Sequence, residues 1–168
     1  MAPVENQSIV IVAQYALYVV AAAAVVVWLM ASRSDKVSLA IEAVVAMVLV
    51  AVMVKVAGAV HADPRPFVQN PGLKPMFPHP ADNGFPSDHT ALATAISVVV
   101  WHYRRPVAWA MLVLSVMIGV ARVAAHVHYT QDIVAALIIG VVAALGARAL
   151  WRQGVKPRLT GNLASLTS

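Results

Sequence analysis

Long apolar stretches separated by short polar segments dominate this chain. Ile9–Met30 and Ser38–Val60 are each long enough to cross a bilayer, which takes about 20 mostly apolar residues. Three further stretches, Ser87–Tyr103, Pro106–Val123 and Thr130–Leu150, predict three more helices, of which the first is short for a full span. The pattern predicts an all-α fold, a polytopic membrane helical bundle of five transmembrane helices, with all 168 residues in a single membrane-embedded domain.

The segment between the second and third stretches differs in kind. His61–Pro86 contains seven of the ten prolines, a density at which a helix cannot continue. We expect an ordered loop or a lid at the membrane surface. The tail, residues 151–168, is polar and basic, and we expect it to be loose.

Composition supports the membrane assignment. Hydrophobic residues make up 61% of the chain and charged residues 11%, whereas a soluble domain has about 25% charged residues. The absence of cysteine excludes disulfides, a thiolate nucleophile and cysteine metal ligands. Residues 1–8 contain no Lys or Arg, so they lack the basic start of a secretory signal.

The basic residues predict an orientation, and no nucleic-acid partner is expected. The net charge is +5, and in membrane proteins Lys and Arg gather in cytoplasmic loops. Five spans place eight of the twelve basic residues on one side: Arg33, Lys36, Arg104, Arg105, Arg148, Arg152, Lys156 and Arg158. We expect this side and the tail to be cytoplasmic, so that the proline-rich loop faces outward.

Arg65 is the first candidate for chemistry. It lies between Pro64 and Pro66, just after the second span, so its backbone is stiff. A guanidinium suits bidentate binding of phosphate. Taken alone, Arg65 is better explained as an interfacial arginine whose stem lies along apolar surface.

A second candidate segment begins the third helix. Pro86-Ser87 predicts a helix N-terminus, where free backbone amides and the helix dipole favour an anion. His89 would lie in the first turn, where it could act as a general acid toward a leaving oxygen. A capping serine followed by an interfacial histidine explains this stretch equally well when it is taken alone.

The third candidate segment joins the last two helices. His128 and Asp132 are four residues apart and therefore share a helix face. A carboxylate bonded to one imidazole nitrogen leaves the other nitrogen free to attack. Arg122 lies just before them, at the end of the fourth span. His126 has no partner at that spacing and is interpreted as a loop or interfacial histidine.

The predicted topology places the three segments on one membrane face. They lie at the end of the second span, at the start of the third, and between the fourth and fifth. Ionisable residues at such positions are functional candidates. Two arginines, two histidines and an aspartate fit phosphoryl transfer through a histidine, since cations stabilise the phosphoryl oxygens, one histidine attacks and the other protonates the leaving group.

At these residues the chain resembles the type 2 phosphatidic acid phosphatase family. The residues that match the motifs of that family are Arg65-Pro66, Pro86-Ser87, His89, Arg122, His128 and Asp132. Members of the family usually have six spans, so the resemblance sets the predicted number at five or six.

The resemblance implies a role for each matching residue. His128 would form a phosphohistidine, Asp132 would orient it, and His89 would protonate the leaving group. Phosphate would be held by Arg65, Arg122 and the region of Ser87. The family needs no metal, and no cofactor is expected.

Two positions depart from the family pattern in ways that bear on phosphate binding. Gly58 stands where the family has a lysine, seven residues before Arg65, and Lys55 lies one helical turn earlier, where it could reach the same phosphate. Asp88 replaces a glycine and adds negative charge beside an anion site. This charge should weaken phosphate binding unless Asp88 caps the helix or engages a cation.

The stretch Phe85–Thr90 is similar to the bacterial undecaprenyl-diphosphate phosphatase branch of the family. That similarity implies hydrolysis of undecaprenyl diphosphate to undecaprenyl phosphate and inorganic phosphate, a step of cell-wall synthesis. It also implies a multi-pass protein of the bacterial inner membrane, with membrane lipid around it and an outward-facing, periplasmic site.

Three alternatives stay open. The same chemistry suits phosphatidic acid, phosphatidylglycerol phosphate or a prenyl-linked sugar phosphate. Ala- and Val-rich helices with interior glycines could instead belong to a small transporter or a membrane scaffold. His61, Asp63 and His79 could form a metal site, although the loop that carries them offers no evident supporting partners.

Overall fold

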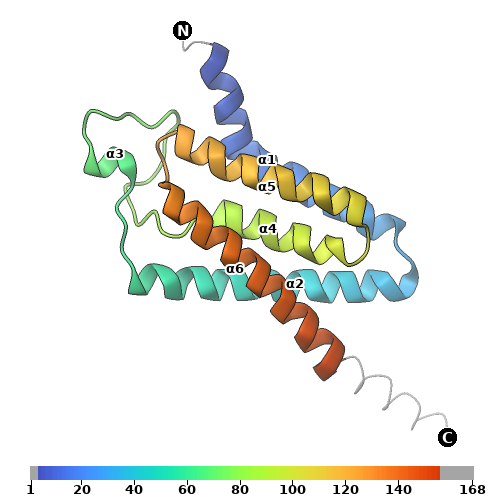
Figure 1. Cartoon of the computed structure of the whole chain (residues 1–168). Coiled ribbons are helices and arrows are strands. Elements are labelled where there is room, and N and C mark those ends of the chain that lie inside the picture. Colours follow the sequence, from blue (N-terminus) through green and yellow to red (C-terminus); the bar gives the residue numbers. More distant parts are fainter. Residues whose placement is uncertain (1–3, 156–168) are drawn as a thin grey trace, which may run out of the picture.

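Helices account for the regular structure of the protein. The computed structural model describes residues 4–155, and within that range it has no β-strand, only an isolated bridge between Pro64 and Asn83. The helices are α1 (Val4–Met30), α2 (Arg33–Val60), α3 (Pro66–Gln69), α4 (Asp88–Trp101), α5 (Arg105–Ala124) and α6 (Thr130–Ala149). Figure 1 shows them as one bundle, with the short α3 set apart in the loop between α2 and α4. The prediction of an all-α membrane bundle is confirmed.

Four helices are long and apolar enough to cross a membrane. They are α1 from Gln7, α2, α5, and α6 with its continuation to Gly154. The helix α4 has only 14 residues and falls short of that length. It is the central helix instead, because it contacts α1, α2, α5 and α6 (Figure 1). The third predicted span is therefore a short helix enclosed by four longer ones.

Two predicted boundaries are corrected. The helix α2 begins at Arg33 instead of Ser38, because the Ser32 side chain accepts a hydrogen bond from Asp35 N at 3.2 Å and caps the helix. The chain does not become loose at Trp151, since α6 continues as a π-helix, Leu150–Val155, in which Trp151 is buried. The rest of the predicted tail, residues 156–168, lies outside the described residues, as do residues 1–3.

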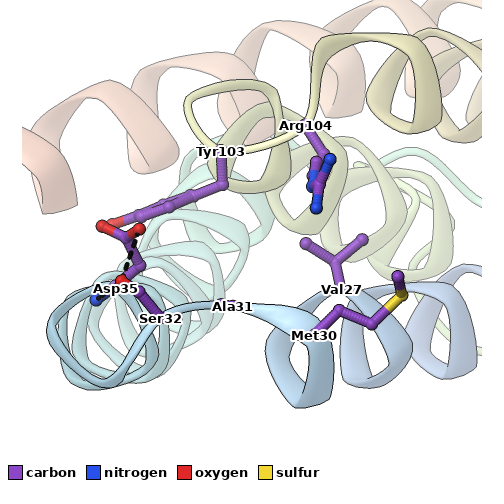
Figure 2. A pocket seen from close by; sticks show the side chains of 7 residues that line it. All are labelled: Val27, Met30, Ala31, Ser32, Asp35, Tyr103 and Arg104. Atoms are coloured by element: carbon purple, nitrogen blue, oxygen red, sulfur yellow. Dashed lines mark hydrogen bonds between the residues drawn. The ribbon is translucent and has the colours of Figure 1, made fainter.

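The end of the bundle formed by the α1–α2 and α4–α5 turns carries charged groups in its interior. Glu42 of α2 is 1% exposed, and Arg148 of α6 donates to its carboxylate at 3.5 Å. A cavity of about 230 Å³ between the two turns is lined by Asp35, Tyr103 and Arg104, among others (Figure 2). Four of the basic residues predicted to be cytoplasmic lie at this end: Arg33, Lys36, Arg104 and Arg105.

The helices α4 and α6 approach each other closely at Gly140. A Cβ atom added there would lie 2.6 Å from Thr94 Cβ, 2.7 Å from Ala91 O and 3.0 Å from Ala95 N. Two of these three atoms belong to the backbone, which gives way less readily than a flexible side chain. Small residues of this kind let membrane helices pack backbone to backbone. Gly140 therefore sets the distance between the two helices that contact each other most extensively.

Replacing Gly140 with alanine should destabilise the bundle without touching the polar end. Overpacking of this kind costs about 1–3 kcal/mol, and thermal unfolding in detergent would measure it as a lowered Tm. Gly146→Ala is the matched control on the same helix, because its added Cβ would meet only Leu49 Cδ1, at 3.5 Å. Equal Tm values for the two variants would contradict this account of α4–α6 packing.

Candidate active site

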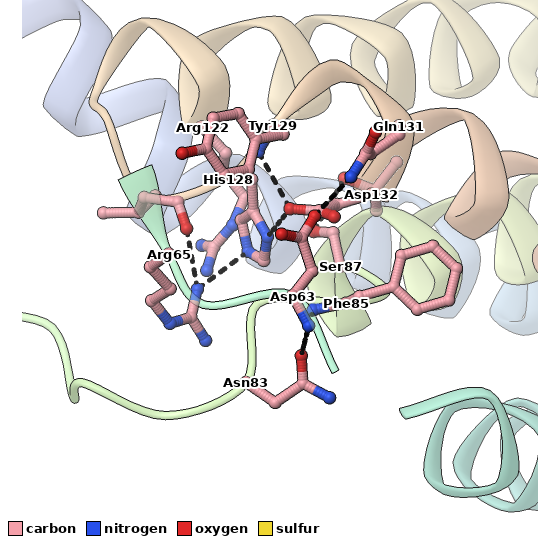
Figure 3. Close-up of polar contacts among 12 residues, drawn as sticks. Asp63, Arg65, Asn83, Phe85, Ser87, Arg122, His128, Tyr129, Gln131 and Asp132 are labelled. Carbon is pink, nitrogen blue, oxygen red and sulfur yellow. Dashed lines mark hydrogen bonds and ion pairs between the residues drawn. The ribbon is translucent and has the colours of Figure 1, made fainter. Parts of the chain in front are cut away.

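The three candidate segments meet at one end of the bundle (Figures 1 and 3). Arg65 is the residue before α3, Ser87 precedes α4, and His128 lies in the turn between α5 and α6. Ser87 N donates to Asp132 O at 3.3 Å, and Arg65 Nη1 donates to Val127 O at 2.8 Å. Segments that are far apart in the sequence are thereby held in one polar cluster.

His128 is 1% exposed, and both of its ring nitrogens have partners (Figure 3). Nδ1 donates to Asp132 Oδ2 at 3.2 Å, and the same oxygen accepts Tyr129 N at 2.8 Å. Nε2 accepts from Arg65 Nη1 at 3.3 Å. Because a guanidinium can only donate, this network assigns the ring proton to Nδ1 and a lone pair to Nε2.

The surroundings of His128 favour its neutral form. Burial lowers the pKa of His128 below its ordinary value; the hydrogen bond to Asp132 opposes this shift, and the charges of Arg122 and Arg65 reinforce it. At neutral pH the imidazole therefore keeps the lone pair on Nε2, which is the form able to attack an electrophile.

Arg65 is fixed by three partners although it arises from a loop. It is 6% exposed, and besides its contacts with Val127 and His128 its Nε donates to Asp82 Oδ1 at 2.8 Å. Burial alone would raise the pKa of Asp82, but the hydrogen bond and charge of Arg65 lower it overall. Arg65 is thus a buried cation held by an exposed carboxylate, with its Nη1 against the ring nitrogen that carries the lone pair.

Arg122 is a second buried cation, 2% exposed, near the end of α5. Its Nη1 donates to Ala13 O of α1 at 3.1 Å, and its Nη2 donates to His79 Nε2 at 3.1 Å. Its Nε is buried without a partner. Within residues 4–155 no carboxylate lies within salt-bridge distance of Arg122. A buried guanidinium without a salt-bridge partner favours the binding of an anion.

His79 belongs to this cluster, whereas the sequence indicated it only as a ligand of the alternative metal site. It accepts the hydrogen bond from Arg122, and its ring centroid lies 6.4 Å from that of His128. Burial, reinforced by the charges of Arg65 and Arg122, lowers the pKa of His79 to about 4. The sequence did contain a signal, because Pro78-His79-Pro80 repeats the arrangement of Pro64-Arg65-Pro66, a polar residue fixed between two prolines.

The residues that begin α4 form a second Asp–His pair. His89 Nδ1 donates to Asp88 Oδ1 at 2.9 Å, and the same oxygen accepts His89 N at 2.8 Å. Asp88 therefore engages both the ring and the backbone amide of the neighbouring histidine. Ser87 is the N-cap residue and fully buried, but its hydroxyl pairs with Thr90 Oγ1 at 3.2 Å and not with a backbone amide.

Asn83 organises the backbone around the cluster, a role that the sequence did not indicate. Its Oδ1 accepts Asp63 N at 2.9 Å and Phe85 N at 3.0 Å. Its Nδ2 donates to Gly58 O at 2.9 Å and to His61 O at 3.1 Å, at the end of α2. One amide side chain thus joins the two ends of the proline-rich segment, which is an ordered loop.

The three residues of the alternative metal site have other partners. The carboxylate of Asp63 accepts the side-chain amides of Gln69 and Gln131, His79 accepts Arg122, and the His61 ring packs on Phe85. Among the described residues no group of three or more His, Cys, Asp or Glu could hold a metal ion.

Two further residues lie outside the cluster. Lys55 is an exposed residue of α2, and no hydrogen bond or ion pair within residues 4–155 joins it to the cluster. At position 58, where the family has its lysine, an added Cβ would lie 3.0 Å from Phe85 O. His126 is not part of the cluster, and its Nδ1 donates to Lys74 O at 3.2 Å.

Comparison with known proteins assigns the chain to a family. The model of the PAP2 superfamily matches residues 39–155, which is well over half of the chain. The chain belongs to the PAP2 superfamily. This membership confirms the resemblance to the type 2 phosphatidic acid phosphatases and makes the protein a lipid phosphatase by family.

Three PAP2 relatives in bacteria are similar over much of the chain. The bacitracin transport permease protein BcrC of Bacillus licheniformis is 33% identical over 83% of this chain and 68% of its own length. The undecaprenyl-diphosphatase BcrC of Bacillus subtilis is 34% identical over 49% of this chain and 42% of its own. Escherichia coli YbjG is 32% identical over 85% and 72%.

The PAP2 fold is also seen in a solved structure. The crystal structure of Aquifex aeolicus LpxE superposes with a TM-score of 0.71, covering 88% of this chain and 87% of that one. At 23% identity this likeness concerns the fold alone. It places the PAP2 motif segments of this chain in a helical arrangement already observed by experiment.

His79 should titrate far below an ordinary histidine. We expect a midpoint near pH 4 in NMR of protein labelled at histidine, with His79→Gln as the assignment control. Arg65→Gln removes one cause of the shift and should raise the midpoint toward 6.5. Because the folded-state pKa is lowered, the contribution of His79 to stability is present above about pH 6.5 and is lost as the pH falls toward 4. A midpoint at 6.5 in the parent protein would contradict the described environment.

Proposed function

We propose that this protein hydrolyses undecaprenyl diphosphate to undecaprenyl phosphate and inorganic phosphate through a phosphohistidine at His128. One observation carries the proposal. The lone pair of a buried, neutral imidazole lies 3.3 Å from a buried guanidinium, and a second buried guanidinium has a free Nε. A phosphoryl group bound between the arginines would accept Arg65 Nη1 in place of the ring, which leaves the lone pair free beside it.

In the first step His128 Nε2 attacks the terminal phosphorus. A P–N bond forms, the bond from phosphorus to the bridging oxygen breaks, and the lipid phosphate leaves with that oxygen. The ring becomes an imidazolium, which Asp132 stabilises through the proton on Nδ1. Arg65 and Arg122 stabilise the charge on the phosphoryl oxygens as it develops.

His89 supplies the proton that the leaving oxygen needs. Asp88 holds its Nδ1, so Nε2 is the nitrogen that faces outward from the pair. In the second step water attacks the phosphohistidine, the P–N bond breaks, and the proton of the water returns to His89. Inorganic phosphate leaves, and both histidines regain their starting state.

Three residues complete the proposed phosphate site. Ser87 lies at the start of α4, where backbone amides favour an anion. Asp88 acts through His89, because both of its described hydrogen bonds go to that residue. Lys55 would reach the phosphate only when substrate is bound, since a lysine side chain is long enough to move from the lipid-facing surface toward an anion.

The proposed substrate rests on the relatives. Two of them are named as undecaprenyl-diphosphatases, one of these only provisionally, and the PAP2 family match covers the segments that carry the cluster. We place the site on the outer side of a bacterial plasma membrane, because basic residues gather at the opposite end of the bundle. The chemistry assigned to the residues requires no metal.

His128→Ala should reduce phosphate release from undecaprenyl diphosphate by about 10³-fold or more, because it removes the nucleophile. The assay uses purified protein in detergent, and EDTA should leave the parent rate unchanged. His126→Ala is the matched control, since that histidine lies two positions away and donates to the loop carbonyl of Lys74. A fully active His128→Ala protein, or a parent activity lost in EDTA, would overturn the mechanism.

A substrate panel separates the proposed activity from its alternatives. We expect kcat/KM for undecaprenyl diphosphate to exceed the values for phosphatidic acid, phosphatidylglycerol phosphate and a prenyl-linked sugar phosphate. Transport is a second candidate function, because one relative bears the name of a transport permease. A transport role predicts no phosphate release from any member of the panel.

A further inference from the structure

A cavity of about 330 Å³ adjoins the proposed reaction centre. Arg122 and His89 line it on the bundle side, and His79 lines it on the loop side. The rest of the lining includes Gln14 and Tyr15 of α1. This cavity is therefore open to the residue that we assign as proton donor and to one of the two arginines.

The helix α1 is tied to the reaction centre by a direct contact. Arg122 Nη1 donates to the backbone oxygen of Ala13, and α1 packs along α5 (Figure 1). Gln14, Tyr15 and Tyr18 follow that carbonyl at spacings that place them on one helix face. The family match begins at residue 39, so it does not include this face of α1.

The direction of the reaction decides which part of the substrate faces this cavity. In phosphoryl transfer the attacking and leaving atoms lie roughly in line on opposite sides of phosphorus. His128 takes the attacking side. The leaving oxygen must lie near the residue that protonates it, His89, and His89 lines the cavity.

We propose that the cavity between α1 and the proline-rich loop is the subsite for the leaving group, and that this leaving group is a prenyl phosphate. This inference rests on the proposed function. Gln14 and His79 face its phosphate, and the rings of Tyr15 and Tyr18 hold the first isoprene units.

The chemistry of the lining suits such an amphipathic group. Tyr15 and Tyr18 are 56% and 68% exposed and line the cavity, so their rings offer apolar area to a ligand there. Phe77 and two prolines of the loop line the cavity with apolar groups that need little ordering. Arg122 supplies the positive charge that a lipid phosphate requires.

Binding can be tested without turnover, because the chain contains no cysteine. In Tyr18→Cys, geranyl phosphate should slow maleimide labelling at least about fivefold. Leu29→Cys is the matched control on the same face of α1, 58% exposed and about 16 Å further along the helix, and should label equally fast with or without geranyl phosphate. Equal labelling of Tyr18→Cys with and without geranyl phosphate would overturn the subsite.

Kinetics then test the role in specificity. The double variant Tyr15→Ala/Tyr18→Ala should lower kcat/KM for geranyl diphosphate by about tenfold or more, while kcat/KM for inorganic pyrophosphate stays within about twofold. Val26→Ala/Leu29→Ala is the matched control, since both residues are exposed and have the same spacing on α1. An equal loss on both substrates, or in the control variant, would overturn the subsite.

The two proposals fail in different ways. If the parent protein releases no phosphate from any prenyl diphosphate, the proposed function falls, and the labelling result still decides whether α1 binds a prenyl phosphate. If the parent is active and the tyrosine variants match it on both substrates, the proposed function stands and the subsite falls.

Discussion

The hydrogen bond between His128 Nδ1 and Asp132 Oδ2 determines what the polar end of the bundle can do. It fixes the tautomer, so the lone pair points to Arg65 instead of into the bundle. Asp132 is fully buried in the first turn of α6, where it also accepts Tyr129 N. The same carboxylate therefore accepts the amide of the residue that caps α6 and also orients the imidazole, so the ring is held in place relative to the helix.

Around this pair, only one of the two buried guanidinium groups has a carboxylate within salt-bridge distance in the part of the chain that the structure describes. Arg65 is paired with the exposed Asp82, and Arg122 has only a carbonyl and a neutral histidine as partners. Buried guanidinium groups normally have carboxylate partners because an unpaired buried charge is costly. Here the guanidinium of Arg122 lacks a carboxylate partner among the described residues, which fits a site that is completed by a phosphate. His79 is desolvated and neutral, so it adds no third positive charge.

The sequence predicted the parts of this arrangement that depend on short spacings. Apolar stretches predicted the helices, and the four-residue spacing of His128 and Asp132 predicted that they meet. The predicted reason, a shared helix face, is wrong, because His128 precedes α6 and the Asp132 carboxylate reaches back to it from the first turn. The sequence also singled out Asp88 as a negative charge beside the anion site, and the carboxylate of that residue accepts the ring and backbone N–H groups of His89.

Other features depend on contacts between distant segments, and periodicity carries no information about them. The bond between Arg122 and the Ala13 carbonyl joins residues 109 apart, and that between Arg122 and His79 joins residues 43 apart. The short length of α4 is likewise visible in the sequence, but its place at the centre follows only from the packing of four longer helices around it. Trp151 was misjudged because its neighbours are polar, while its own indole is buried in the bundle.

The bond between Arg122 and the Ala13 carbonyl also has a consequence for biogenesis. The helix α1 leaves the ribosome first, whereas its polar partner is synthesised 109 residues later, near the end of α5. Until α5 is in place, the Ala13 carbonyl lacks its arginine donor and, among the described helices, α1 packs only against α2 and α4. The wall of the reaction centre between α1 and α5 is therefore completed only when the fifth helix joins the bundle.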